Sequence, residues 1–258
     1  MTLSQPFLSI IIPAHNEEKR LPPSLLKINA FLQAQPFTAE VIIVENGSRD
    51  QTLAIAQEHA RRLPYLRAFR EEQRGKGLAV RRGMLEARGE YRFICDADLS
   101  MPIEQVSRFL PPNLTGFDVA IGSREAPGSA RYNEPSYRHI IGRIFNLMVR
   151  LMALPGLQDS QCGFKCFTAA AAEDVFSRQT LPGMSFDVEA LFIARLRGYR
   201  LVEVPIDWYF DPDSRVRLVQ DSLRMFLDLV TIRKNGLARR YGEPRPGAPR
   251  YSAPEKHG

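Results

Sequence analysis

The segment YRFICDADLS, residues 91–100, decides the fold, because an apolar run leads directly into two aspartates that one alanine separates. Short runs rich in aromatic and branched side chains are typical of buried strands. An acidic turn directly after such a strand is typical of the ligand-binding edge of an open α/β sheet. We therefore predict a buried strand at 91–95 and a binding loop that begins at Asp96.

Two further apolar runs, LSIII at 8–12 and EVIIV at 40–44, precede this segment, and each ends in a polar turn. A shorter strand is expected at 65–70. Helical patterns lie between the runs, at 17–33, about 48–62 and 77–88. Strands that alternate with helices predict an α/β fold, in which a mostly parallel, Rossmann-like sheet is flanked by helices and binds ligands at the carboxyl ends of its strands.

The pattern loosens after residue 100. We expect strands at 117–121 and 201–209, a loop at 125–135, and amphipathic helices at 136–154 and 216–232. No internal repeat divides the chain.

We interpret residues 1–232 as one domain, with a ligand-binding half at about 1–100 and a second half at about 101–232. Residues 233–258 contain many prolines, glycines and basic side chains. Such a composition buries too little apolar surface to fold alone, so we expect a disordered tail.

Most of the excess positive charge lies in this tail. The chain of 258 residues has a formal net charge of +6, and seven Lys or Arg face two Asp or Glu after residue 230. The first 230 residues are therefore almost neutral. A nucleic-acid-binding domain, which carries its basic patch on the folded body, is not indicated.

The composition is that of a globular protein, with 44% hydrophobic and 25% charged residues. Three scattered cysteines are too few for a disulfide framework and lack zinc-ligand spacing, so we expect a cytoplasmic protein. The apolar run at 7–13 lacks the basic flank of a signal peptide, and no apolar stretch reaches the roughly 20 residues of a membrane span. Any membrane contact is expected to be peripheral.

The two aspartates at 96 and 98 carry the most informative chemistry. Two carboxylates can converge on a hard divalent cation, Mg²⁺ or Mn²⁺, whose remaining positions water and phosphate oxygens occupy. Such a site suits a nucleotide diphosphate. The alternative is that either aspartate caps a turn, which their position after a buried strand makes the weaker interpretation.

Polar groups also follow the other strands, as PAHNEE at 13–18, ENGSRD at 45–50 and RGKG at 74–77. Because parallel strands end at one edge of a sheet, these groups can surround a base, a ribose and phosphates. The alternative, helix capping by Asn16, Ser48 and Asp50, is compatible with that role.

Together these blocks resemble the family 2 glycosyltransferases with a GT-A fold and, among them, the dolichyl-phosphate β-glucosyltransferases and dolichol-phosphate mannose synthases. The resemblance covers about 8–232. The blocks that carry it are IIPAHNEE (11–18), VIIVENGSRDQT (41–52), GKGLAVRRGM (75–84), DADLS (96–100), GSR (122–124), DSQCGFKCF (159–167) and SFDVEAL (185–191).

The resemblance implies a donor site for a nucleotide sugar, UDP-glucose favoured over GDP-mannose. The implied nucleotide-sugar-binding residues are Pro13, Glu17, Glu45, Lys76 and Asp96. The implied metal ligands are Asp96 and Asp98, with Ser100 as a third candidate, and the implied cofactor is Mg²⁺ or Mn²⁺.

The resemblance also implies inverting transfer of a hexose to a polyprenyl or dolichyl phosphate, with Asp98, Asp187 and Arg124 as the catalytic residues. A phosphate acceptor is already anionic and needs positive charge more than it needs a base. The candidate residues that bind this acceptor phosphate are Arg124, Arg138, Lys165 and Arg215.

A lipid acceptor gives the two amphipathic helices a second interpretation. A helical apolar stripe is most often core, but the helix at 136–154 is rich in Ile, Leu, Met and Phe with arginines at its margins. We expect peripheral docking on the cytoplasmic face of a membrane through 136–154 and 216–232, aided by the basic tail.

Two other functions stay open. A GT-A enzyme can use a sugar or other hydroxyl acceptor, for which Asp187 is the natural base. A nucleotide-sugar-binding protein without catalysis is the third hypothesis, which the presence of Asp96, Asp98, Arg124 and Asp187 makes weaker.

Overall fold

A computed structural model of the chain describes residues 5–211 and 218–246, with the backbone alone for 218–223. The strands are β1 (Leu8–Ala14), β2 (Ala39–Glu45), β3 (Leu66–Arg70), β4 (Tyr91–Ile94), β5 (Val119–Ser123), β6 (Ala130–Tyr132), β7 (Lys165–Thr168), β8 (Leu201–Pro205) and β9 (Asp207–Tyr209). The α-helices are α1 (Leu21–Gln33), α2 (Thr52–Arg62), α3 (Lys76–Glu86), α4 (Ser136–Met152), α5 (Ala169–Arg178), α6 (Phe186–Leu196) and α7 (Leu218–Leu237), and η1 (Ile103–Phe109) is a 3-10 helix.

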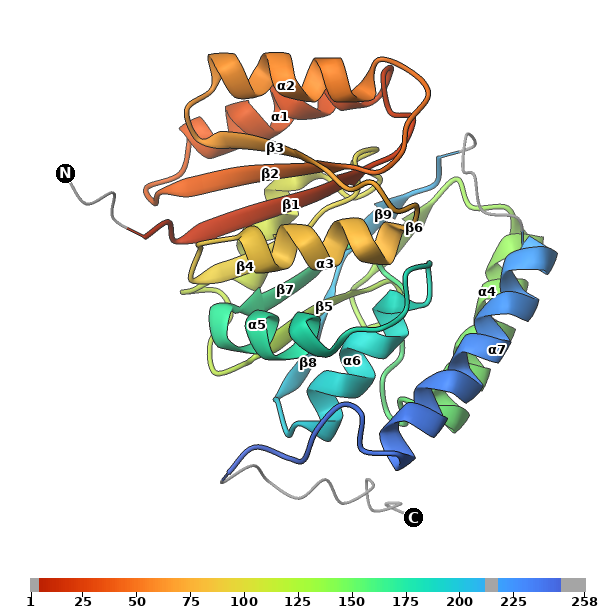
Figure 1. Ribbon diagram of the computed structural model, residues 1–258. Coiled ribbons are helices and arrows are strands. Elements are labelled where there is room, and N and C mark those ends of the chain that lie inside the picture. The colour runs from red at the N-terminus through yellow and green to blue at the C-terminus, as the bar shows by residue number, and fades with distance from the viewer. Residues whose placement is uncertain (1–4, 212–217, 247–258) are drawn as a thin grey trace.

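The main sheet has the strand order β3-β2-β1-β4-β7-β5-β8 in the described part of the chain (Figure 1). Strands β1 to β4 run parallel to one another, as do β5 and β8. Strand β7 runs antiparallel to both of its neighbours, β4 and β5. The predicted mostly parallel sheet is therefore confirmed, and one reversed strand joins its two halves.

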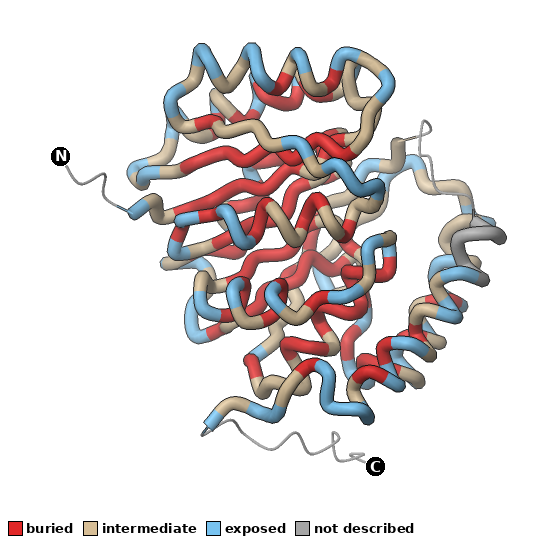
Figure 2. The backbone as a smooth tube through the Cα atoms, in the orientation of Figure 1, coloured by how far each residue is buried: buried red, intermediate tan, exposed pale blue. Residues whose placement is uncertain are grey.

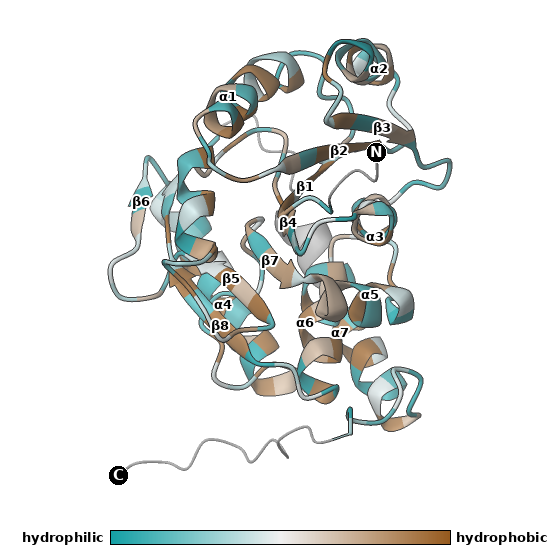
Figure 3. Cartoon of the chain, turned by 90° about the vertical axis from the view of Figure 1, so that its left-hand side faces the viewer, coloured by the Kyte–Doolittle hydropathy of each residue, from teal (hydrophilic) through white to brown (hydrophobic). Residues whose placement is uncertain are grey.

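Helices cover both faces of this sheet, and Figure 3 shows α1 and α3 on opposite sides of it. Alternate residues of β1 face opposite ways: Ile10 and Ile12 pack under α1, α2 and η1, and Ile11 packs under α3. Burial on both faces explains why the strands read as continuous apolar runs. Figure 2 shows the strands as the buried interior.

Several predicted boundaries move for local reasons. Helix α1 begins at Leu21 rather than at 17, because Pro22 and Pro23 lie in its first turn, where a missing N–H costs least. The predicted strand at 201–209 is two strands, since β8 joins the main sheet and β9 pairs with β6. Strand β7 and helices α5 and α6 occupy a region for which the apolar pattern predicts no element.

Helices α4 and α7 pack against each other at one side of the body (Figure 1). They correspond to the predicted amphipathic segments 136–154 and 216–232, of which residues 216 and 217 lie outside the described residues. Phe145, Val149, Leu229 and Ile232 are buried in the core on the α3 side of the sheet. No helix in the described ranges combines the length and the apolar composition that crossing a bilayer requires.

The end of the chain differs from the prediction of a tail that is disordered from residue 233. Helix α7 continues to Leu237, and Tyr241 is completely buried. Tyr241 is one of the few apolar side chains in that stretch, and a single aromatic ring buries enough surface to anchor a short segment. Residues 247–258 lie outside the described residues.

Candidate active site

The polar segments predicted to form the site meet at one edge of the sheet. Because β1, β2, β3 and β4 are parallel, their carboxyl ends lie together. Strand β5 also ends at this edge, and the antiparallel β7 begins there, since Lys165 pairs with Ile94 and Ile121. The topology therefore brings the loops that follow Ala14, Glu45 and Ile94 to the loop of Arg124.

Asp96 and Asp98 follow β4 as predicted. The Asp98 carboxylate accepts a hydrogen bond from the backbone N–H of Ser100 at 3.0 Å, across Leu99, whose φ is +48°. Burial and the neighbouring charge of Asp96 raise the pKa of Asp98. A nearby cation stabilises the charged form of a carboxyl group that is costly to ionise by itself.

The donor set fits a divalent cation. Both side chains offer hard carboxylate oxygens, and a β-carbon at Gly163 would lie 2.2 Å from Asp96 Oδ2, so only glycine leaves room for that oxygen. No group of three or more His, Cys, Asp or Glu gathers elsewhere in the described ranges or here. Any ion held by this pair would therefore take most of its ligands from the substrate and water.

Lys76, the first residue of α3, provides the cation that faces Asp96. Its Nζ lies 2.6 Å from Asp96 Oδ1. Burial lowers the pKa of Lys76, but the charges of Asp96 and Asp187 outweigh it and the net pKa is raised. Lys76 is therefore protonated beside the predicted metal ligands and near the predicted phosphates.

Asp187 and Lys165 form a buried ion pair, with Lys165 Nζ 2.6 Å from Asp187 Oδ1. Burial raises the pKa of Asp187, and Lys165 and Lys76 partly offset this. Lys165 also donates to the carbonyl of Cys162 and has no exposed surface. The prediction that Lys165 binds the acceptor phosphate therefore does not fit its position, because its ammonium group is directed at Asp187 and away from solvent.

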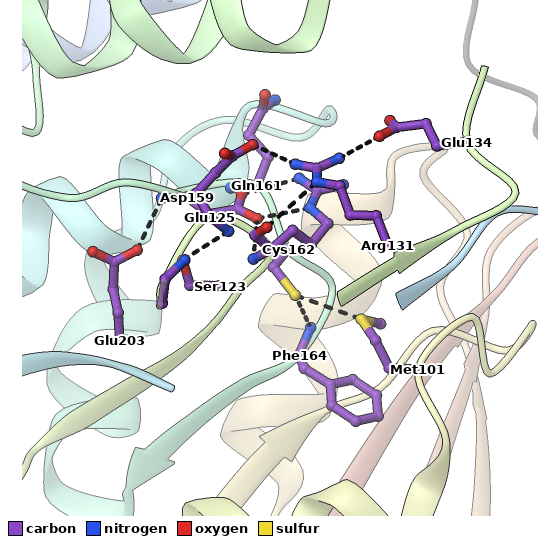
Figure 4. Close-up of polar contacts among 12 residues, drawn as sticks. Met101, Ser123, Glu125, Arg131, Glu134, Asp159, Gln161, Cys162, Phe164 and Glu203 are labelled. Carbon is purple, nitrogen blue, oxygen red and sulfur yellow. Dashed lines mark hydrogen bonds and ion pairs between the residues drawn. The ribbon is translucent and has the colours of Figure 1, made fainter. Parts of the chain in front are cut away.

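Arg124 forms a two-pronged ion pair with Asp159, a residue for which the sequence alone indicates no role. Its Nε lies 2.7 Å from Oδ2 and its Nη2 lies 3.0 Å from Oδ1. Burial alone would raise the pKa of Asp159, but Arg124 lowers it to about 2. Glu203 accepts from the Asp159 backbone N–H at 2.9 Å, and Figure 4 shows this support.

Arg131, Glu125 and Glu134 form a second charged network (Figure 4). Arg131 contacts Glu125 and lies 2.6 Å from Glu134. Both Arg124 and Arg131 lie over the ring of Trp208, at 5.4 and 5.8 Å from its centre. A cavity of about 60 Å³ lies between this network and α4, and its lining includes Arg124, Arg131, His139 and Gln161.

The two remaining acceptor candidates are placed differently. Arg138 lies over the ring of Phe210, 5.0 Å from its centre, at the start of α4. Arg215 lies outside the described residues.

The residues predicted to bind the nucleotide also hold the loops around them. Glu17 receives two hydrogen bonds from Arg20, which reaches Asp211 at 2.9 Å and whose charge acts on Asp98. Glu45 accepts from the Ser48 backbone and is buried. Pro13 stands in β1 beside this strand end. The sequence does not indicate the role of Arg20, because Asp211, its second partner, is 191 residues away.

Asn46, which follows β2, is hydrogen-bonded to the loop that precedes α3. Its side chain accepts from the Gly75 N–H at 2.6 Å and donates to the carbonyl of Gln73 at 2.5 Å. The sequence places Asn46 after a strand, but only the fold brings it to residues 73–75. An amide side chain can donate to one residue and accept from another because it carries both an N–H donor and a carbonyl acceptor.

Similarity to known proteins extends over most of the chain. The model of the glycosyl transferase family 2 matches residues 9–176. A dolichyl-phosphate beta-glucosyltransferase of Drosophila melanogaster is 36% identical over 242 residues, covering 87% of this chain and 74% of the relative. Proteins of the same name from Trichomonas vaginalis and Homo sapiens are 33% and 32% identical over 241 residues, covering 89% and 88% of this chain and 71% and 74% of those relatives.

Solved structures share the fold at lower identity. Glucosyl-3-phosphoglycerate synthase from Mycobacterium tuberculosis in complex with UDP superposes with a TM-score of 0.61 at 20% identity, over 94% of this chain and 82% of that one. The same enzyme with Mn²⁺ and UDP-glucose gives a TM-score of 0.59 at 18% identity, over 94% and 81%.

Proposed function

The chain belongs to glycosyl transferase family 2, and from this membership we propose that it moves glucose from UDP-glucose to a dolichyl or other polyprenyl phosphate with inversion at the sugar. One observation carries the proposal. Arg124 stands at the same sheet edge as the cluster of Lys76, Asp96 and Asp98, and its Nη1 nitrogen does not contact its buried partner, Asp159. The chain is about one-third identical to dolichyl-phosphate beta-glucosyltransferases.

On the donor side, Asp96 and Asp98 would hold a divalent cation, Mg²⁺ or Mn²⁺, against the diphosphate. A bound cation supplies Lewis-acid stabilisation of the charge that forms on the leaving diphosphate. Lys76 holds a second positive charge there, 2.6 Å from Asp96. Its ammonium group can turn from Asp96 to a phosphate oxygen once the carboxylate has another cation to face. GDP-mannose is the alternative donor.

On the acceptor side, an oxygen of the lipid phosphate attacks the anomeric carbon. The new carbon–oxygen bond forms as the bond to the diphosphate breaks, and the electron pair leaves with the nucleoside diphosphate. The attacking oxygen is already anionic, so no proton has to be removed. The relatives are named beta-glucosyltransferases, and a β product from an α-linked donor requires this inversion.

Arg124 is placed to hold the acceptor phosphate. Its Nε and Nη2 face Asp159, so Nη1 is the nitrogen that can donate to a phosphate oxygen; no described residue has a hydrogen bond to it. Asp159 locks the plane of the guanidinium group, and Trp208 lies under it at 5.4 Å. A fixed guanidinium loses little conformational entropy when it binds. Arg138 and Arg215 stay in the proposal as additional phosphate contacts.

Asp187 has two proposed roles that depend on the acceptor. With a phosphate acceptor it orients Lys165 and adds to the negative charge that holds Lys76 near the diphosphate. With a hydroxyl acceptor its pKa, which burial raises, would suit a general base. Transfer to polyprenyl phosphate compared with transfer to free prenol separates these roles.

We propose that the outer face of α4 meets the membrane that contains the lipid acceptor. Five apolar side chains repeat at three- and four-residue spacing and are between 53% and 78% exposed: Tyr137, Ile140, Ile144, Leu147 and Leu151. A continuous exposed stripe of this length is uncommon on a soluble surface. Arg143 and Arg150 are exposed beside it, as in an interfacial helix. Phe226 and Leu227 extend the apolar surface onto α7.

We place this docking on the cytoplasmic face, because the three cysteines are free and buried, as a reducing compartment allows. The basic tail that was expected to assist lies partly outside the described residues. Its described part includes Arg239 and Arg240, which are exposed. Such residues add attraction to anionic lipid.

The reaction is tested by incubating the purified protein with Mn²⁺ or Mg²⁺, with UDP-glucose or GDP-mannose, and with a short-chain polyprenyl phosphate. We expect a glucosylated lipid from UDP-glucose and none when free prenol replaces its phosphate. Product from the free prenol would overturn the phosphate acceptor and favour Asp187 as a base. A protein that binds UDP-glucose but transfers glucose to no acceptor would favour the binding-protein alternative.

Membrane docking is tested separately by sedimentation with vesicles that contain anionic lipid. Leu147→Glu places a charge in the middle of the stripe, and we expect vesicle binding to fall about tenfold or more. Leu26→Glu is the matched control, because Leu26 is 69% exposed on α1, away from α4. Equal loss in both variants, or in neither, would contradict docking through α4.

A further inference from the structure

The start of α3, which presents Lys76, is held by a distant loop. Helix α3 has no side-chain cap. Instead, the Gly77 N–H donates to the Pro182 carbonyl at 2.9 Å, and Gln179 Nε2 donates to the Gly77 carbonyl at 2.9 Å. The loop at 179–182, between α5 and α6, therefore supplies an acceptor for an N–H group at the helix start, as a cap otherwise does, and also fixes the Gly77 carbonyl.

The loop packs too closely against the start of α3 to slide along it. A β-carbon at Gly75 would lie 2.1 Å from the Pro182 carbonyl oxygen, and one at Gly77 would lie 2.6 Å from the Leu181 carbonyl oxygen. Backbone touches backbone at both positions. A shift of the loop must therefore move the residues on either side of Lys76.

Glu189 of α6 holds the loop in place. It is completely buried, and its carboxylate accepts from the N–H groups of Thr180 at 3.0 Å and Leu181 at 2.8 Å. The Thr180 hydroxyl donates to it at 2.5 Å. A buried carboxylate needs several donors to offset its lost hydration. These three donors all come from the loop.

The fourth donor comes from the end of the chain. The Tyr241 hydroxyl donates to Glu189 Oε1 at 2.8 Å. Asn235 of α7 donates to the same hydroxyl at 3.2 Å and to the Thr180 hydroxyl at 3.4 Å. Burial and the Glu189 carboxylate raise the pKa of Tyr241, so the phenol keeps its proton for this bond. The ring lies against Phe192, with centres 6.1 Å apart.

We infer that Tyr241 is a positioning residue for the donor diphosphate, acting through Glu189 and the 179–182 loop on Lys76. The inference rests on the proposed role of Lys76. If the hydroxyl is lost, the Glu189 carboxylate keeps only donors from the loop itself, and the 3.4 Å hydrogen bond from Asn235 to the Thr180 hydroxyl is the link to α7 that remains among these residues. The loop then loosens, and Gly77 loses its fixed hydrogen-bond partner.

The test compares Tyr241→Phe, which removes only the hydroxyl, with Tyr199→Phe. Tyr199 is also a buried tyrosine, but its hydroxyl donates to the Ala170 carbonyl at 3.3 Å and interacts with Asp174, both of which belong to α5 and not to the 179–182 loop. Both changes keep the aromatic ring, so both are expected to fold. Hydrogen exchange of the α3 amides is measured in each full-length protein without substrate, followed by KM for UDP-glucose and for the lipid acceptor.

We expect Tyr241→Phe to speed exchange at residues 76–79 about tenfold and to raise KM for UDP-glucose several-fold, with the acceptor KM and kcat nearly unchanged. Tyr199→Phe leaves both readouts at the wild-type values. Exchange at 76–79 that matches the control would overturn the inference, as would an equal rise in both KM values. The exchange measurement needs no donor, so it decides the inference even if the proposed transfer reaction fails.

Discussion

Replacing Asp159 by asparagine tests whether a buried ion pair holds Arg124 for the acceptor. The change keeps the shape of the side chain and removes its charge. In the wild type, Asp159 accepts from Arg124 Nε at 2.7 Å, Arg124 Nη2 at 3.0 Å and the Gln161 N–H at 3.2 Å. The asparagine amide would turn an N–H toward one of these donors, so the variant leaves Arg124 partly unpaired.

The magnitude follows from the pKa of Asp159. Arg124 lowers it from 3.8 to about 2, a difference that corresponds to about 2 kcal/mol of folding stability at neutral pH. A carboxyl whose pKa is depressed in the folded state contributes this stability above its unfolded pKa and loses it as the pH falls from about 4 to about 2. About half of it, roughly 1 kcal/mol, is lost by pH 3.

The assay is urea unfolding of the wild type and Asp159→Asn at pH 7, 5, 4 and 3. Breaking a buried pair costs about 3–5 kcal/mol in total, so the variant is clearly less stable at pH 7. We expect the difference in free energy of unfolding between the two proteins to narrow by about 1 kcal/mol between pH 5 and pH 3, because only the wild type loses the ion pair. A gap that stays constant over this range would refute the reasoning.

The remaining predictions concern the two sides of the transfer reaction. We expect Asp98→Asn to abolish transfer while the protein still folds. The control is Glu104→Gln, a change of an exposed residue on η1, which is expected to leave transfer unchanged. Retained activity in Asp98→Asn would show that Asp98 is not a metal ligand. Gly163→Ala places a methyl group 2.2 Å from Asp96 Oδ2, so Mn²⁺ affinity measured by titration falls while the melting temperature changes little. Arg124→Lys loses the two-pronged pair, and kcat/KM for the lipid phosphate drops about 10- to 100-fold with the UDP-glucose KM unchanged; a parallel change in both would argue against an acceptor role.

Most elements in the first half of the fold can be predicted, because they depend on residues that are close together in the sequence. The strands at 8–12, 40–44 and 91–95 are predicted within a few residues of β1, β2 and β4, because buried parallel strands are continuous apolar runs. The position of Asp96 and Asp98 follows from the same pattern, since a loop that leaves a parallel strand must open at the carboxyl edge. The family resemblance rests on these blocks together with those at 122–124, 159–167 and 185–191.

The elements of the second half are harder to predict from the sequence. Strand β7 has four residues, KCFT, and its one charged residue, Lys165, is buried. A lysine at the start of a short apolar run predicts exposure when only its neighbours in sequence are known. Its burial depends on Asp187, 22 residues away on α6, because a buried ammonium group requires a carboxylate partner.

The sequence by itself determined the parallel half of the sheet, the carboxylate pair at its edge and the family, because each depends on side-chain patterns within a few residues. Only the tertiary structure decided which charges meet: Arg124 with Asp159, Lys76 with Asp96, and Tyr241 with Glu189. These partners are separated by between 20 and 52 residues. Ion pairs and hydrogen bonds act over a few ångströms of space, and the chain brings such residues together only when the sheet and its helices have packed.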